Sequence, residues 1–114
     1  MFNYSELDET EAEFYEIGSA DLPSGERLYV EIDGKPIVIF NIAGHFFAID
    51  DFCTHDDGPL GDGLLDGYHI VCPRHGAEFD VRNGKAMLMP AVVDIPSYPL
   101  KVIGEIIYIG LPKK

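Results

Sequence analysis

Basic side chains are scarce in this 114-residue chain, and their scarcity argues against two classes of partner. Eight Lys and Arg stand against twenty Asp and Glu, which gives a formal net charge of −12. Binding to DNA or to an anionic membrane surface depends mainly on Lys and Arg contacts. We therefore expect neither nucleic acid nor membrane as a partner. A strongly acidic surface favours encounters with basic patches on proteins, although it also serves solubility.

Long apolar runs are missing as well. No segment approaches the ~20 apolar residues that a bilayer-spanning helix requires. Residues 1–16 are rich in Glu and contain no Lys or Arg, the opposite of a signal or transit peptide. We therefore expect a cytoplasmic protein. A reducing compartment suits cysteines that serve as metal ligands rather than as a disulfide.

The sequence also lacks an amphipathic helix of useful length and any internal repeat. Instead, short β-branched and aromatic runs alternate with turn residues, which predicts an all-β antiparallel sandwich or barrel. Asp33-Gly34 and Asn83-Gly84 are hairpin signals, and Gly104-Glu105 is expected to turn a last hairpin over 98–109. Residues 50–67, rich in Gly and Asp, should be mostly loop. The other expected strands are 27–32, 35–40, 45–49, 68–71 and 78–81.

The length allows one domain. Residues 1–12 are expected to form a flexible acidic segment with few apolar anchors, and residues 13–114 to form a single domain. Only two cysteines are present, and both belong to one pattern, Cys53-Thr54-His55 followed by Cys72-Pro73-Arg74-His75-Gly76. Two thiolates and two imidazoles from two short loops make one four-ligand metal site. Such a donor set suits zinc or an iron–sulfur cluster, so the ligands leave both open.

The surrounding residues resemble the Rieske family over roughly residues 46–99. The resemblance implies a [2Fe-2S] cluster in which Cys53 and Cys72 bind one iron and His55 and His75 bind the other. It also implies a β base domain with a small cluster-binding subdomain, here about residues 51–89. Zinc stays as the alternative, but structural zinc sites usually place like ligands within one arm, whereas here each arm mixes Cys and His.

The chain departs from the respiratory branch of that family at four positions. Those members carry an additional Cys in each loop, and the pair forms a disulfide; the matching residues here are Gly58 and Arg74. They also carry a Ser and a Tyr that donate hydroxyl hydrogen bonds to cluster sulfur, where this chain has Ala77 and Phe79. Fewer donors destabilise the reduced state. We therefore predict a reduction potential near the low end of the Rieske range, about −150 mV.

Several residues near the ligands carry weaker expectations. Residues 87–90, which include Met87 and end at Pro90, match a proline-containing loop that covers the cluster in the family, although ordinary core packing is compatible with the same residues. Asp56 and Asp57 are expected at the exposed edge of the site. Arg74 is either a local positive charge, a docking contact or an exposed loop residue. His45 and His69 are expected to be structural or exposed, because the four-ligand set is complete without them.

The resemblance implies an electron carrier, a Rieske-type ferredoxin, rather than an enzyme. Such a carrier accepts electrons from a flavoprotein reductase and passes them to a terminal oxygenase or a similar enzyme, and we expect a monomer. A small electron-transfer subunit of a nitrite-reductase-like complex is the alternative. A terminal oxygenase would need a second iron site in a separate domain, for which the chain is too short. A zinc-stabilised interaction module is the remaining alternative.

Overall fold

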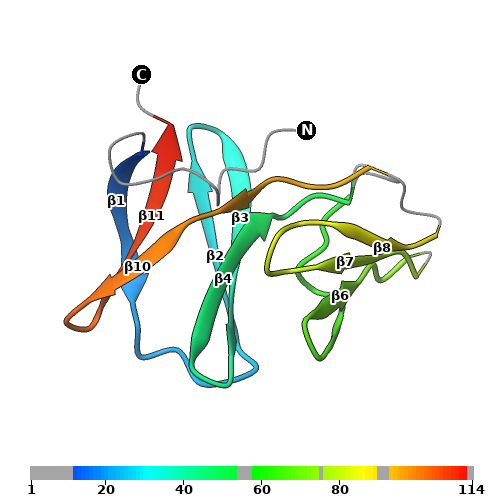
Figure 1. The fold of residues 1–114 in the computed structure, drawn as a ribbon, viewed down its shortest axis with the longest axis horizontal. Helices are drawn as coiled ribbons and strands as arrows, with labels where there is room; N and C mark the ends of the chain where they lie inside the picture. Colours follow the sequence, from blue (N-terminus) through cyan, green and yellow to red (C-terminus); the bar gives the residue numbers. More distant parts are fainter. Residues whose placement is uncertain (1–11, 54–57, 75, 90–92, 113–114) are drawn as a thin grey trace.

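A computed structural model of the chain describes residues 12–53, 58–74, 76–89 and 93–112. Within these ranges the structure has eleven β-strands in three antiparallel sheets (Figure 1). The strands are β1 (Ala12–Ser19), β2 (Arg27–Ile32), β3 (Lys35–Ile42), β4 (His45–Asp50), β5 (Leu64–Asp66), β6 (His69–Val71), β7 (Glu78–Asp80), β8 (Ala86–Leu88), β9 (Ser97–Tyr98), β10 (Leu100–Ile103) and β11 (Ile106–Pro112). The all-β prediction is confirmed.

Two sheets form the base of the molecule. One has the order β1-β11-β10 and the other the order β2-β3-β4-β9. A buried core joins them, with Ile37, Ile39 and Ala48 from the second sheet and Ile109 from the first. Successive side chains of a strand point to opposite faces, so the remaining residues of β3 must pack elsewhere.

The second face of β3 belongs to a different core. Val38 and Phe40 are fully buried and pack with Cys53 and Cys72 and with apolar residues of the third sheet. The continuous apolar run in β3 is thereby explained, because each of its two faces covers a separate core.

The third sheet has the order β5-β6-β7-β8 and lies at one end of the molecule, beyond β3 and β4 in Figure 1. The chain leaves the base after β4 and returns at β9, and these two strands pair with each other through Ala48↔Tyr98 and Ile49↔Ser97. A backbone hydrogen bond from Asp50 N to Pro96 O closes the same point, at 3.1 Å. The segment that carries both cysteines is therefore a single excursion between two neighbouring strands.

Two predictions about strands hold only in part. Residues 50–67 were expected to be mostly loop, but residues 64–66 form β5. A close approach at Gly63 accompanies its pairing with β6; an added Cβ at Gly63 would lie 1.8 Å from the Val71 carbonyl oxygen. Residues 98–109 were expected to form one hairpin, but Tyr98 pairs with β4 and only β10 and β11 form the hairpin. Pro99 separates the two because it has no N–H to donate to a ladder.

The other turn predictions hold. Asp33 and Gly34 both have positive φ, 52° and 79°, which is typical of the turn that suits a two-residue hairpin. Asn83-Gly84 lies in the connection between β7 and β8, where Gly84 N donates to Asp80 O at 2.7 Å. Residues 1–11 of the expected acidic segment lie outside the described residues. The described part of the chain contains no helix long and apolar enough to cross a membrane.

Candidate metal centre

The two cysteines lie in the same buried cluster although they come from different parts of the chain. Cys53 follows β4 and is 0% exposed, and Cys72 follows β6 directly and is 1% exposed. Neither forms a disulfide, and both pack with Leu60, Ala77 and Phe79. Their predicted partners His55 and His75 lie outside the described residues.

Short backbone hydrogen bonds close the two loops that carry the predicted ligands. Cys53 N donates to Gly58 O at 2.8 Å, so the two ends of the first loop lie side by side. Cys72 N donates to Ala77 O at 2.7 Å and closes residues 72–77 in the same way. Gly76 has a φ of 78° with no neighbouring atom within 4 Å of an added Cβ. Position 76 therefore requires glycine because of its backbone conformation and not because of crowding.

Residues distant in the sequence hold the chain that follows the first loop. The Asp51 carboxylate accepts hydrogen bonds from Leu60 N at 2.8 Å and Gly61 N at 2.6 Å. The Arg27 guanidinium, from β2, donates to the carbonyl oxygens of Gly61 and, at 2.5 Å, of Gly63. These contacts fix the return path of the first loop against the base.

Tyr29 covers the same stretch of chain from the outside. Its hydroxyl donates to the Asp62 carboxylate at 2.6 Å. Burial and this hydrogen bond raise the pKa of Tyr29 to about 12. An added Cβ at Gly61 would lie 2.8 Å from the Tyr29 ring, so the glycine lets the ring and the loop approach closely.

An ion pair lies at the end of β7, in the third sheet. The buried Asp80 carboxylate accepts from Arg82 Nη2 at 2.8 Å and Nε at 3.0 Å, and from the Arg82 backbone N at 2.9 Å. Burial would raise the pKa of Asp80, but the side-chain and backbone hydrogen bonds from Arg82 outweigh it and lower that pKa. The Arg82 guanidinium also lies over the Tyr68 ring at 4.2 Å.

Sequence reasoning missed Asp51, Arg27, Tyr29 and the Asp80–Arg82 pair. Arg27 and Tyr29 act across more than thirty positions of sequence, and no local pattern marks them. The Asp80–Arg82 pair has a local signal, an acid and a base two positions apart, but such a spacing is common on exposed turns.

The remaining expected site residues divide between several places. His69 pairs with Glu78 at 3.1 Å, consistent with a structural histidine, and His45 is exposed at the start of β4. Met87 and Met89 are 46% and 70% exposed, so the alternative of ordinary core packing does not hold for them. Their shielding role stays a prediction, and Pro90, Asp56 and Asp57 lie outside the described residues.

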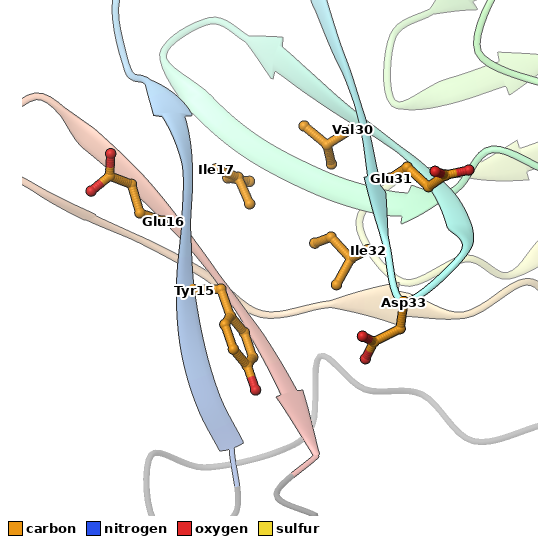
Figure 2. A pocket seen from close by; sticks show the side chains of 7 residues that line it. All are labelled: Tyr15, Glu16, Ile17, Val30, Glu31, Ile32 and Asp33. Atoms are coloured by element: carbon orange, nitrogen blue, oxygen red, sulfur yellow. The ribbon is translucent and has the colours of Figure 1, made fainter.

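A groove elsewhere on the molecule is no candidate for the metal centre. It measures about 520 Å³ and lies between β1 and β2, each at the edge of its sheet among the described strands. Figure 2 shows Ile17, Val30 and Ile32 between the two strands, with Glu16 and Glu31 directed away from the gap. Its lining holds neither cysteine nor histidine.

The described donors fit a cluster or a metal ion. A charged group buried without a partner is unfavourable, and metal coordination is a way to stabilise a buried thiolate. Two reduced thiols, both fully buried in one cluster and each at the start of a closed loop, meet that requirement. The thiol geometry by itself does not distinguish zinc from iron.

Comparison with known proteins makes that distinction. The family model described as "Rieske [2Fe-2S] domain" matches residues 13–99. The ferredoxin component of the naphthalene 1,2-dioxygenase/salicylate 5-hydroxylase systems of Ralstonia sp. is 40% identical over 82 residues, which cover 72% of this chain and 79% of that protein. The ferredoxin subunit of the 3-phenylpropionate/cinnamic acid dioxygenase of Shigella flexneri is 41% identical over 96 residues, 82% of this chain and 89% of that protein.

Solved structures agree. The Sphingomonas yanoikuyae B1 ferredoxin has a TM-score of 0.80 and 29% identity, and the match covers 88% of this chain and 100% of that one. A chain in the complex of reduced oxygenase and oxidized ferredoxin in carbazole 1,9a-dioxygenase gives a TM-score of 0.81 at 30% identity, covering 89% of this chain and 95% of that one. The family match spans both closed loops and the strands from β1 to β9, and β10 and β11 lie beyond it. This chain belongs to the Rieske [2Fe-2S] domain family.

Proposed function

We propose that this protein is the ferredoxin component of an oxygenase system, which carries one electron at a time to a terminal oxygenase. The observation that carries the proposal is the similarity to proteins named as ferredoxin components, at 40–41% identity over 72–82% of this chain. The structural match to a ferredoxin crystallised with its oxygenase supports the same partner. The electron donor in this proposal is a flavoprotein reductase.

The proposal assigns Cys53, His55, Cys72 and His75 as the ligands of a Rieske-type [2Fe-2S] cluster. When bound, the cluster takes up and releases a single electron. The chain's own contribution is to bury both thiols, to exclude water from them and to hold each loop closed by a backbone hydrogen bond. In the sequence, His55 lies between Cys53 and Gly58, and His75 lies between Cys72 and Ala77.

Docking in this proposal uses the end of the molecule that carries the third sheet. Met87, Leu88 and Met89 are exposed there at the end of β8. Redox encounters use small interfaces, and a short exposed apolar segment beside the ligand loops suits a brief contact. The net charge of −12 adds long-range attraction to basic partners. A monomer located in the cytoplasm completes the proposal.

The alternatives receive less support. No relative reported above is named as a nitrite-reductase subunit, so that function is not favoured. A terminal oxygenase from Nocardioides aromaticivorans IC177 matches at a TM-score of 0.80, but at 20% identity and over only 31% of its own chain. That likeness concerns the fold, and this chain spans less than a third of such an oxygenase.

The test is a redox titration of the purified protein, followed by electron paramagnetic resonance. We expect a Rieske-type signal in the reduced protein and a midpoint potential near −150 mV. Cys53→Ser and Cys72→Ser should each abolish the visible absorption, whereas His45→Asn, at an exposed histidine outside the site, should retain it. A colourless protein that contains zinc, or a clearly positive midpoint, would contradict the proposal.

A further inference from the structure

One side chain contacts both ligand loops. The Arg74 guanidinium, in the second loop, lies against Gly58, the residue that closes the first; an added Cβ at Gly58 would lie 2.6 Å from Cζ and 2.7 Å from Nη2. The same Nη2 donates a hydrogen bond to Cys72 Sγ at 3.4 Å. The guanidinium therefore connects the first loop to a thiol of the second.

The guanidinium occupies the place that a side chain at position 58 would take. Gly58 is not among the described residues with positive φ, so backbone conformation does not require glycine there. Three guanidinium atoms lie within 3.0 Å of the position that a Cβ would occupy. A separation under 3.0 Å is closer than non-bonded heavy atoms pack, so any larger residue at position 58 would displace Arg74.

The contact brings a permanent positive charge to a sulfur ligand. Arginine remains protonated in proteins, and a hydrogen bond from a charged donor is stronger than one from a neutral donor. Reduction adds negative charge to the site that Cys72 helps to form. A cation in contact with Cys72 Sγ stabilises the reduced state more than the oxidised state, and it does so in a chain with few basic residues.

We propose that Arg74 is a positioning residue that joins the two ligand loops non-covalently and raises the reduction potential of the centre. It stands, with Gly58, at the two positions that hold a bracing disulfide in the respiratory branch of the family, from which this chain departs. The inference rests on the proposed function in one respect, the assignment of Cys72 as a cluster ligand. In this chain, a hydrogen bond and a packing contact of one cationic side chain take the place of the covalent link.

The test compares midpoint potentials of the intact protein and three variants. Arg74→Gln keeps a polar side chain but removes the charge, and should lower the equilibrium constant for reduction about tenfold, or 59 mV for one electron. Arg74→Lys keeps the charge without the planar fork and should retain more of the potential. Gly58→Ala leaves Arg74 in the sequence but pushes the guanidinium away from the sulfur, so it should lower the potential in the same direction.

Two further readouts separate the brace from a general loss of structure. The rate at which the cluster is lost on dilution into chelator should rise in both Arg74→Gln and Gly58→Ala. The double variant should be no worse than Arg74→Gln, because both substitutions break one contact. Arg82→Gln is the matched control, since Arg82 pairs with Asp80 rather than with a cysteine; it should leave the potential nearly unchanged.

An unchanged or higher potential in Arg74→Gln would overturn the inference, as would additive effects of the two single substitutions. If the wild-type protein gives a normal Rieske signal and the variants give either of these results, this inference is refuted and the proposed function stands. A wild-type protein without that signal would refute both.

Discussion

At the scale of single residues, two apolar side chains in the second loop set an expectation for the reduction potential. Ala77 and Phe79 are both 0% exposed and pack in the core that holds Cys53 and Cys72. Neither side chain carries a hydroxyl, so neither can donate to a ligand sulfur. Their burial in the same cluster means that a hydroxyl added at either position would have little water available to it.

Restoring these hydroxyls should raise the midpoint potential. A charge-assisted hydrogen bond contributes about 1–3 kcal/mol, and one electron moved through 100 mV corresponds to about 2.3 kcal/mol. Ala77→Ser together with Phe79→Tyr would add two such bonds, or about 2–6 kcal/mol. The double variant should therefore raise the midpoint by about 100–250 mV in a redox titration. Phe47→Tyr, at a half-buried ring that packs on the same core, is the control. No rise would assign the low potential to backbone donors or to solvent instead.

The Asp80–Arg82 pair makes a prediction about pH. Because the pKa of Asp80 is lowered in the folded protein, its stabilising contribution is fully present above the unfolded value of about 3.9 and is lost as pH falls through the folded value. Asp80→Asn should lower the unfolding free energy at pH 7 by about 1–2 kcal/mol, a modest figure because the Arg82 end is half exposed and screened.

The measurement is the thermal midpoint of both proteins between pH 7 and pH 3. The gap between wild type and Asp80→Asn should be constant down to about pH 5 and then close as Asp80 is protonated. Any acid loss of the cluster that is common to the two proteins cancels in the gap. Asp66→Asn, at an exposed carboxylate of β5, should show no such gap. A gap that widens toward acid would contradict the assigned direction.

At the scale of secondary-structure elements, the pairing of β5 with β6 depends on one close approach. An added Cβ at Gly63 would lie 1.8 Å from the Val71 carbonyl oxygen, immediately before Cys72. Gly63→Ala must therefore separate β5 from β6 and disturb the residue that precedes the ligand. Overpacking costs about 1–3 kcal/mol and occasionally more, and a backbone collision belongs at the upper end.

Gly67→Ala, in the same hairpin, supplies a matched control. Gly67 has a φ of 59° and no atom within 4 Å of an added Cβ, so alanine there costs about 1–2 kcal/mol of backbone strain and nothing from collision. Chemical unfolding and the iron content of the purified proteins should both rank wild type above Gly67→Ala and Gly67→Ala above Gly63→Ala. Equal losses in the two variants would show that the close approach relaxes freely.

How far the sequence predicted these elements depended on the range of the interactions involved. Local signals identified β2, β3 and the Asp33-Gly34 turn, because turn chemistry and alternation act over a few residues. The sequence did not predict β5, because its pairing depends on the contact of Gly63 with Val71 in β6. β9 and β10 were merged because only the tertiary pairing of Tyr98 with β4 separates them.

The candidate site divides in the same way. Spacing and residue type identified Cys53 and Cys72, and the structure places both in one buried cluster. His55 and His75 stay predictions, since they lie outside the described residues. The supports that Asp51 and Arg27 provide could not be predicted from spacing, because they depend on how the first loop folds back against the base.

At the scale of the whole molecule, the net charge of −12 makes the proposed charge-guided docking testable. The screening length falls from about 30 Å at 0.01 M salt to about 10 Å at 0.1 M. Electrostatically steered association is about 10- to 1,000-fold faster than unsteered association. The second-order rate of reduction by a reductase should therefore fall at least several-fold over that range of salt.

The measurement is stopped-flow bleaching of the visible absorption at a series of salt concentrations. Substituting Glu31→Gln, at an exposed carboxylate of β2, should change the salt dependence little, because it removes only one of twenty acidic side chains. A rate that is flat or rises with salt would show that apolar contact at Met87–Met89 dominates the encounter and that charge serves solubility.

The pairing of β4 with β9 has a further consequence, for protein engineering. Residues 51–96 leave the base at β4 and re-enter it at β9, and these two strands are hydrogen-bonded neighbours. For the base, the segment is therefore equivalent to one long hairpin connection. Closing a longer loop between fixed neighbours costs little additional entropy, so the segment has the properties of a transplantable cassette. A recipient sheet must offer adjacent antiparallel strands and, in place of Val38 and Phe40, two alternate apolar positions facing the graft.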